Sequence, residues 1–98
     1  MPKRTHIDDQ LDVLAAVEAA TRKAGRSARA GADVFEVANA LGTINPKLLG
    51  ARRERLVGEL RGLGYIALRH EGLRVLWSLT PTGAVAAAMH KAQDPVED

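Results

Sequence analysis

A set of cationic side chains lies along one face of a helix that the sequence predicts from Asn45 to Leu63. Leucines at helical spacing form an apolar stripe on one side, and Lys47 and Arg55 project from the opposite side. Lysine and arginine bind phosphate oxygens, and an arginine guanidinium can also donate two hydrogen bonds to the edge of a guanine base. The chemistry available to this face is therefore recognition of a polyanion, above all nucleic acid.

The predicted ends of this helix have local signals. Asn45 suits an N-cap, Pro46 suits the first helical position, where no backbone N–H is needed, and Gly64 suits the stop. Ala51 and Gly58 on the outer face would let a partner approach closely. The candidate contact residues of this segment are Asn45, Lys47, Ala51, Arg52 and Arg55. Taken alone, however, the pattern also fits an ordinary solvated amphipathic helix, and the neighbouring elements have to decide.

Two other charged residues of this helix are expected to have structural roles. Arg53 projects near the centre of the leucine stripe, so we expect it to snorkel or to form a salt bridge beneath the acidic first turns of the first helix. Glu54 lies on the outer face, where it would repel phosphate unless it accepts a hydrogen bond from cytosine N4. A surface ion pair is the expected role of Glu54.

Two helices are predicted before this one. Apolar residues at helical spacing predict a helix from about Ile7 to Ala24, with acidic residues in its first turns and basic residues in its last. Residues 25–32 are predicted to form a loop or a very short strand. Asp33 then opens a second helix with Glu36 in capping-box spacing, and Gly42 is expected to end it.

Strand-like alternation follows Gly64. Residues 65–70 and 73–79 are rich in β-branched, aromatic and leucine residues, and Glu71-Gly72 is predicted as the hairpin turn between them. A last helix with an alanine-rich face is predicted over residues 81–92.

The two ends of the chain look different from the rest. Residues 1–6 are expected to form a flexible leader and residues 93–98 a loose acidic tail. The domain itself is expected to span residues 7–92.

Two motifs carry a resemblance to winged helix-turn-helix domains. The run Leu60-x-x-Leu63-Gly64-Tyr65-Ile66 resembles a recognition helix that continues into the first strand of a wing. The run Trp77-x-Leu79-Thr80-x-x-Gly83 resembles the closure of the wing. Together with the order of elements, they make residues 33–83 similar to the core of bacterial MarR- and PadR-type transcriptional regulators. The chain is shorter than those regulators and lacks the helical extensions that they use for dimerisation and effector binding.

The resemblance implies a fold and a function. The fold would be α+β and mostly helical, with a three-helix core, a helix-turn-helix over residues 33–63, a two-stranded wing over 65–79 and a C-terminal helix. The function would be binding of double-stranded DNA, with helix 46–63 in the major groove and the wing on the backbone or minor groove. Further candidate contacts are Ser27 and Arg29 before the second helix, and Arg69, His70 and Arg74 near the tip of the hairpin.

Composition agrees with a small basic domain. The 98 residues suffice for one domain, and residues 22–74 hold eleven lysines and arginines against five acidic residues, although the net charge is only +2. The absence of cysteine excludes disulfides and thiolate metal sites, and no stretch has the roughly 18 apolar residues of a membrane span. A cytoplasmic, nucleoid-associated protein is expected.

Other chemistries have little support. His6, His70 and His90 lie far apart in sequence, so neither a metal site nor a cofactor is expected. No serine has a nucleophile-elbow setting, and the glycines after residue 57 do not follow a strand as a phosphate-binding loop would. We therefore expect no enzyme.

Several alternatives stay open. The alanine face of helix 81–92 either closes the core or forms the seam of a homodimer. A winged helix can also serve as a protein-interaction module or an accessory subunit. A DNA-binding component of a partitioning, excision or replication system would have the same sequence features as a transcriptional regulator.

Overall fold

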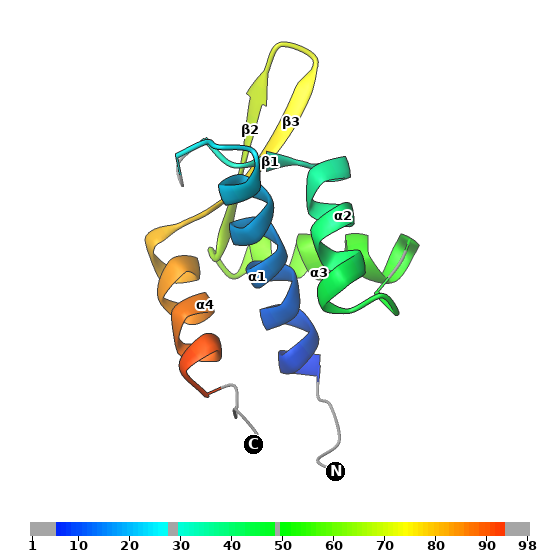
Figure 1. Ribbon diagram of the computed structural model, residues 1–98, viewed down its shortest axis with the longest axis vertical. Helices are drawn as coiled ribbons and strands as arrows, with labels where there is room; N and C mark the ends of the chain where they lie inside the picture. The colour runs from blue at the N-terminus through cyan, green and yellow to red at the C-terminus, as the bar shows by residue number, and fades with distance from the viewer. Residues whose placement is uncertain (1–5, 28–29, 49, 94–98) are drawn as a thin grey trace.

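The computed structural model describes residues 6–27, 30–48 and 50–93, and within these residues the chain forms four helices and one antiparallel sheet of three strands (Figure 1). The α+β, mostly helical class is therefore confirmed. The order is α1 (His6–Lys23), β1 (Ala32–Asp33), α2 (Val34–Ile44), α3 (Gly50–Gly62), β2 (Ile66–Glu71), β3 (Arg74–Leu79) and α4 (Pro81–Gln93). His6 and Gln93 belong to helices, not to the predicted leader and tail, whose other residues lie outside the described ranges.

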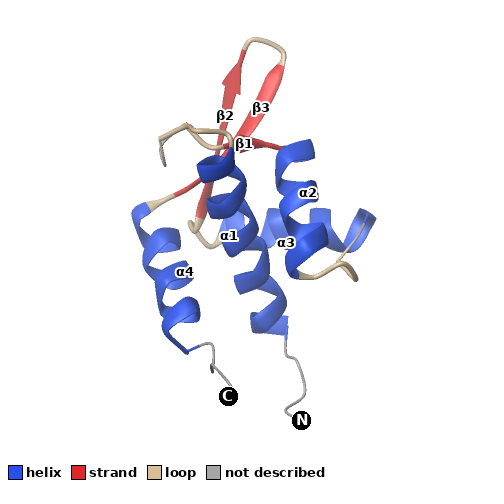
Figure 2. Cartoon of the chain, viewed as in Figure 1, coloured by secondary structure: helices blue, strands red, loops and turns tan. Residues whose placement is uncertain are grey.

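The sheet has the order β1-β3-β2 and so contains one strand more than the predicted hairpin. The short β1 adds to the free edge of β3, with Ala32 opposite Trp77. In the hairpin, Glu71 pairs with Arg74, so the turn is Gly72-Leu73 and not Glu71-Gly72. Gly72 has a φ of +63°, which favours glycine at the first position of a two-residue hairpin turn. The hairpin extends away from the helices (Figure 2).

The hydrophobic core is built around α1, which lies between α4 and α2 (Figure 1). Val13, Leu14 and Val17 of α1 are almost fully buried, as are Leu56 and Leu60 of α3. Burial of each such side chain contributes about 1.5–3 kcal/mol of transfer free energy. Trp77 and Leu79 of β3 pack against this core from the sheet.

The second helix begins as predicted and ends later. The Asp33 side chain accepts a hydrogen bond from the backbone N–H of Glu36, and the Glu36 side chain accepts one from the backbone N–H of Asp33, which confirms the capping box. The helix does not stop at Gly42. It runs on to Ile44, because the backbone N–H of Asn45 still donates to the carbonyl of Leu41 at 2.7 Å.

The third helix begins five residues after the predicted N-cap. Asn45 ends α2 and starts a turn in which the backbone N–H of Leu48 donates to the Asn45 carbonyl at 3.1 Å. Leu48 is buried below this turn, and α3 starts only at Gly50. The predicted capping role of Asn45 is therefore wrong.

The end of α3 agrees with the prediction. Gly64 has a φ of +80°, and the backbone N–H groups of Gly64 and Tyr65 donate to the carbonyls of Arg61 and Leu60. This is a Schellman closure, which requires a residue in the left-handed region. Leu63, predicted in the apolar stripe, is instead 57% exposed, because the closure turns it away from the core.

A close junction joins the end of α3 to the start of α4. The Thr80 hydroxyl donates to the Gly64 carbonyl at 2.5 Å and accepts from the backbone N–H of Gly83 at 3.0 Å, so Thr80 caps α4. The backbone N–H of Thr80 also donates to the Tyr65 carbonyl. A Cβ on Gly83 would lie only 1.8 Å from that carbonyl oxygen. The Leu79-Thr80-Pro81-Thr82-Gly83 segment is thus the point where the hairpin and the last helix close on α3.

Candidate nucleic-acid interface

The outward face of α3 contains Ala51, Glu54, Arg55, Gly58 and Gly62, all of them exposed. Ala51 and Arg55 therefore lie where the sequence predicts. A Cβ added to either Gly58 or Gly62 would meet no atom within 4 Å. Within the described residues, Arg55 has no hydrogen-bond or ion-pair partner. The result is a slim helix face with one long cationic side chain.

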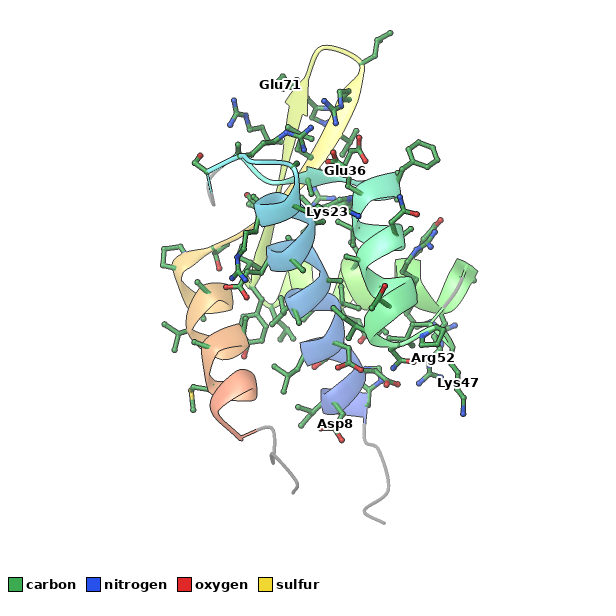
Figure 3. All side chains as sticks on the ribbon, in the orientation of Figure 1. Asp8, Lys23, Glu36, Lys47, Arg52 and Glu71 are labelled. Atoms are coloured by element: carbon green, nitrogen blue, oxygen red, sulfur yellow. The ribbon has the colours of Figure 1, made fainter. Side chains whose placement is uncertain are left out.

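The neighbouring Arg52 is held by the first helix. Its Nη2 donates to Oδ2 of the buried Asp9 at 2.5 Å, while much of the guanidinium remains exposed (Figure 3). The sequence predicted that Arg53 snorkels or forms a salt bridge beneath the acidic turns of α1. Arg52 forms that salt bridge instead, and the half-buried Arg53 lines a cavity together with Val57 and Trp77.

Asn45 also has an internal role. Its Nδ2 donates to Oδ2 of Asp12 at 3.0 Å and contacts Oδ1 of Asp9 at 3.4 Å. Its Oδ1 accepts from the backbone N–H of Lys47 at 3.2 Å. The two aspartates of α1 therefore hold the turn before α3, and Arg52 holds the start of the helix. These contacts fix the position of α3 relative to the rest of the chain.

Lys47 occupies that turn and is exposed. In Figure 3 its side chain points outward at the same end of the molecule as Arg52. No partner binds its ammonium among the described residues. Among the described residues, Lys47 and Arg55 are thus the two candidate cations of this region without a hydrogen bond or close ion pair to a carboxylate, although the charge of Arg55 helps to lower the pKa of Glu59.

The three candidate contacts on the hairpin differ in how strongly other side chains of the protein hold them. His70 is exposed on β2, and Arg69 is exposed with a long 3.4 Å contact to Glu71. Arg74 Nη2 instead donates to Asp33 Oδ2 at 2.6 Å and lies 3.7 Å from Glu36 Oε1. Arg74 therefore connects the hairpin to the capping box of α2.

Ser27 is exposed in the loop before β1, and Arg29 lies outside the described residues. Sequence reasoning did not single out Arg26, which donates to Glu36 Oε1 at 2.5 Å. It likewise gave no internal role to Glu59. Glu59 Oε1 accepts from Gln10 at 3.2 Å and lies 2.6 Å from Nε2 of His6, so it ties α3 to α1. No local pattern signals either contact, since the partners are distant in sequence.

Four charged side chains lie around the N-terminus of α2, and their interactions shift pKa values: Arg26, Asp33, Glu36 and Arg74. The backbone N–H of Glu36 and then the Arg74 guanidinium lower the pKa of Asp33. The Arg26 guanidinium lowers the pKa of Glu36, and Glu36 in turn raises the pKa of Arg26. Both carboxylates are partly exposed, so solvent screens these interactions.

This cluster predicts a loss of stability in acid. A carboxyl with a folded-state pKa below its unfolded value stabilises the fold above the unfolded pKa of about 4, and this contribution disappears as the pH falls through the folded pKa. We expect the urea midpoint of the wild-type chain to fall over this range more steeply than that of a D33N/E36Q double variant. Equal slopes would show that protonation of Asp33 and Glu36 does not change the stability of the fold.

Comparisons with protein-family models, with curated proteins and with solved structures find no match. The described residues contain no helix long and apolar enough to cross a membrane, and no group of three or more histidine, aspartate or glutamate side chains arranged to hold a metal ion.

Proposed function

We propose that the chain is a small winged helix-turn-helix protein that binds double-stranded DNA and regulates transcription. In this proposal α2 and α3 form the helix-turn-helix, α3 enters the major groove, and the β2–β3 hairpin is the wing. The observation that carries the proposal is the outward face of α3, which combines three small residues with the unpaired Arg55.

The glycines of this face support close approach of a partner. A glycine inside a helix costs about 1 kcal/mol relative to alanine, and neither Gly58 nor Gly62 lies near another atom of the chain that a Cβ would meet. Neither glycine has a positive φ. Their benefit would therefore come from a surface outside the chain, and a major groove about 12 Å wide admits a helix most readily when its outer face is slim.

The charges of the region divide into two roles. Arg55 is the candidate for base recognition, because it lies on the outward face and is free to form a bidentate pair with guanine. Lys47, Arg69, His70 and Ser27 are candidates for phosphate contacts, which position a protein without specifying sequence. Arg52 and Asn45 act mainly by holding α3 in place through the aspartates of α1.

Homodimerisation through α4 is part of this proposal. Val85 and Met89 on its outer side are 59% and 56% exposed, and residues 81–89 contain no charge that would repel a second copy. A two-fold dimer would place two α3 helices on half-sites about one DNA turn, or roughly 34 Å, apart.

A protein-interaction module is the second candidate function. The exposed apolar side chains favour it, since Phe35 at the start of α2 is 77% exposed and Leu73 at the hairpin turn is fully exposed. Such residues are common in interfaces and contribute little to phosphate binding. A role in partitioning, excision or replication would use the same DNA contacts as transcriptional regulation.

Selection from a pool of random duplexes tests the proposal, with the mass of the free and bound protein measured in solution. We expect enrichment of a defined sequence and an affinity that falls steeply with salt, by a slope of about 0.9 per phosphate contact. The absence of binding to any duplex at low salt, together with a stoichiometric partner in purified preparations, would instead support the interaction module.

A further inference from the structure

Glu54 is an exposed acidic side chain on the outward face of α3. The sequence predicts a surface ion pair for it. Within the described residues, however, Glu54 has neither a hydrogen bond nor an ion pair. That expectation is therefore wrong, and the outward face combines an unpaired carboxylate with the guanidinium of Arg55.

The neighbours of Glu54 on the helix explain why it has no partner. Side chains three and four positions apart are neighbours on a helix surface, whereas adjacent residues diverge. The four such positions around Glu54 carry no charged or polar side chain: Gly50, Ala51, Val57 and Gly58. Arg53 and Arg61 line the same cavity as Glu54, but neither forms an ion pair with it. The carboxylate is therefore available to a partner outside the chain.

A carboxylate at this position has a consequence for the binding of a polyanion. When α3 enters the major groove, Glu54 lies between two rows of phosphates and is repelled by them, since the groove is only about 12 Å wide. A hydrogen bond from a base offsets this repulsion. In the major groove, guanine and thymine present acceptors and adenine presents an acceptor beside its donor, whereas cytosine presents only the N4 donor. Cytosine is thus the base that a carboxylate matches.

We propose that Glu54 is a specificity-determining residue that reads a cytosine in the base pair next to the guanine read by Arg55. This inference rests on the proposed function. The side chains of Glu54 and Arg55 diverge by about 100° around the helix axis, on either side of Gly58, so they reach different base pairs. At every other sequence the charge of Glu54 stays unpaired and opposes binding. The same carboxylate therefore favours one sequence and disfavours the others.

Selection from random duplexes with the wild-type chain and with Glu54→Gln tests the assignment. Glutamine has nearly the shape of glutamate but no charge, and its amide matches the N6 donor and N7 acceptor of adenine. We expect one cytosine of the wild-type site to become adenine in the variant, while the guanine read by Arg55 stays. The same preferred base at every position in both proteins would overturn the assignment.

Fluorescence anisotropy measures two changes in affinity of opposite sign. Glu54→Ala should weaken binding to the selected duplex by about fivefold to a hundredfold, the usual effect of one mismatched base pair. On a random duplex at low salt it should instead strengthen binding by about threefold or more, because a repulsive charge is removed. Changes of the same sign on both duplexes, or no change on either, would overturn the proposal.

Glu18→Gln is the matched control, because it makes the same chemical change on another helix. Glu18 of α1 pairs with Arg22 and lines a pocket together with Ala84 of α4, so its replacement should change neither the selected sequence nor the affinity. If Glu18→Gln also strengthened binding to random duplexes threefold, net charge and not the position of Glu54 would explain the effect, and the proposal would be overturned.

N4-methylcytosine at the selected position tests the contact without any substitution in the protein. This base still pairs with guanine, but it presents a methyl group to the major groove in place of the N–H. We expect the wild-type chain to lose about as much affinity for the methylated duplex as Glu54→Ala loses for the unmodified one. An undiminished affinity for the methylated duplex would overturn the reading of cytosine.

The outcomes separate this inference from the function on which it rests. If no duplex binds at low salt, the proposed function fails and the role of Glu54 fails with it. If a defined sequence is enriched but is identical for Glu54→Gln, DNA binding stands and only the role of Glu54 fails. Circular dichroism of each variant checks folding, and the result with N4-methylcytosine does not depend on any variant.

Discussion

Replacing Gly83 with alanine is expected to lower the free energy of unfolding by about 3 kcal/mol, near the upper end of the usual cost of overpacking. The new Cβ would lie 1.8 Å from the Tyr65 carbonyl oxygen and 3.1 Å from its Cα, and both are backbone atoms that cannot rotate away. The start of α4 would have to move away from Tyr65. That movement would weaken the Thr80 contacts to Gly64 and Tyr65. Urea denaturation followed by circular dichroism measures the change.

Gly58→Ala is the matched control for this prediction. It makes the same chemical change within a helix, but its Cβ meets no atom within 4 Å. We expect it to raise the free energy of unfolding by about 0.5–1 kcal/mol, because alanine favours the helix and loses less entropy on folding. If the two substitutions had equal effects, the close junction between α4 and Tyr65 would not be the reason for glycine at position 83.

Replacing Arg55 with alanine is expected to weaken binding to the preferred duplex by about tenfold to hundredfold. The reason is that a bidentate base contact contributes about 1–3 kcal/mol to the binding free energy. Binding to random duplexes should fall much less, because there Arg55 contributes only charge. Fluorescence anisotropy with both duplexes at the same salt concentration measures the two losses. Stability should change little, since Arg55 is exposed and has no internal partner among the described residues.

Two comparison variants sharpen this result. Arg74→Ala should weaken preferred and random duplexes by the same factor, because Arg74 is bound to Asp33 and acts through phosphate or through the placement of the hairpin. Arg22→Ala removes an exposed arginine of α1 that pairs with Glu18 and should change neither. An equal loss on both duplexes for Arg55→Ala would assign Arg55 to the backbone and leave base recognition without an arginine on this face.

Local signals predicted most of the elements correctly. The capping box at Asp33, the glycine at position 64 and the alternation of residues 65–79 each depend on neighbours within a few positions. Such patterns stabilise a turn or a helix end wherever the element lies in the fold. The exposed position of Ala51 and Arg55 also followed from helical spacing alone.

Two failures around the start of α3 concern choices between distant partners. Asn45 has the residue type of an N-cap, but Asp9 and Asp12 bind its side chain and draw the preceding turn against α1. Arg52 and Arg53 are adjacent in sequence, and a helical projection does not show which of them comes within reach of a carboxylate on α1. The position of Asp9 in the packed structure decided it.

The sequence by itself thus determined the order of the elements, the end of α3 at Gly64, the capping box of α2, and a slim cationic face on α3. Tertiary structure alone decided which cations stay available on that face. Ion pairs form when two side chains come within about 4 Å, and that distance depends on how the helices pack. Packing engaged Arg52, Arg26 and Arg74 with carboxylates, left Lys47 and Arg55 unpaired, and placed Arg53 beside an apolar cavity.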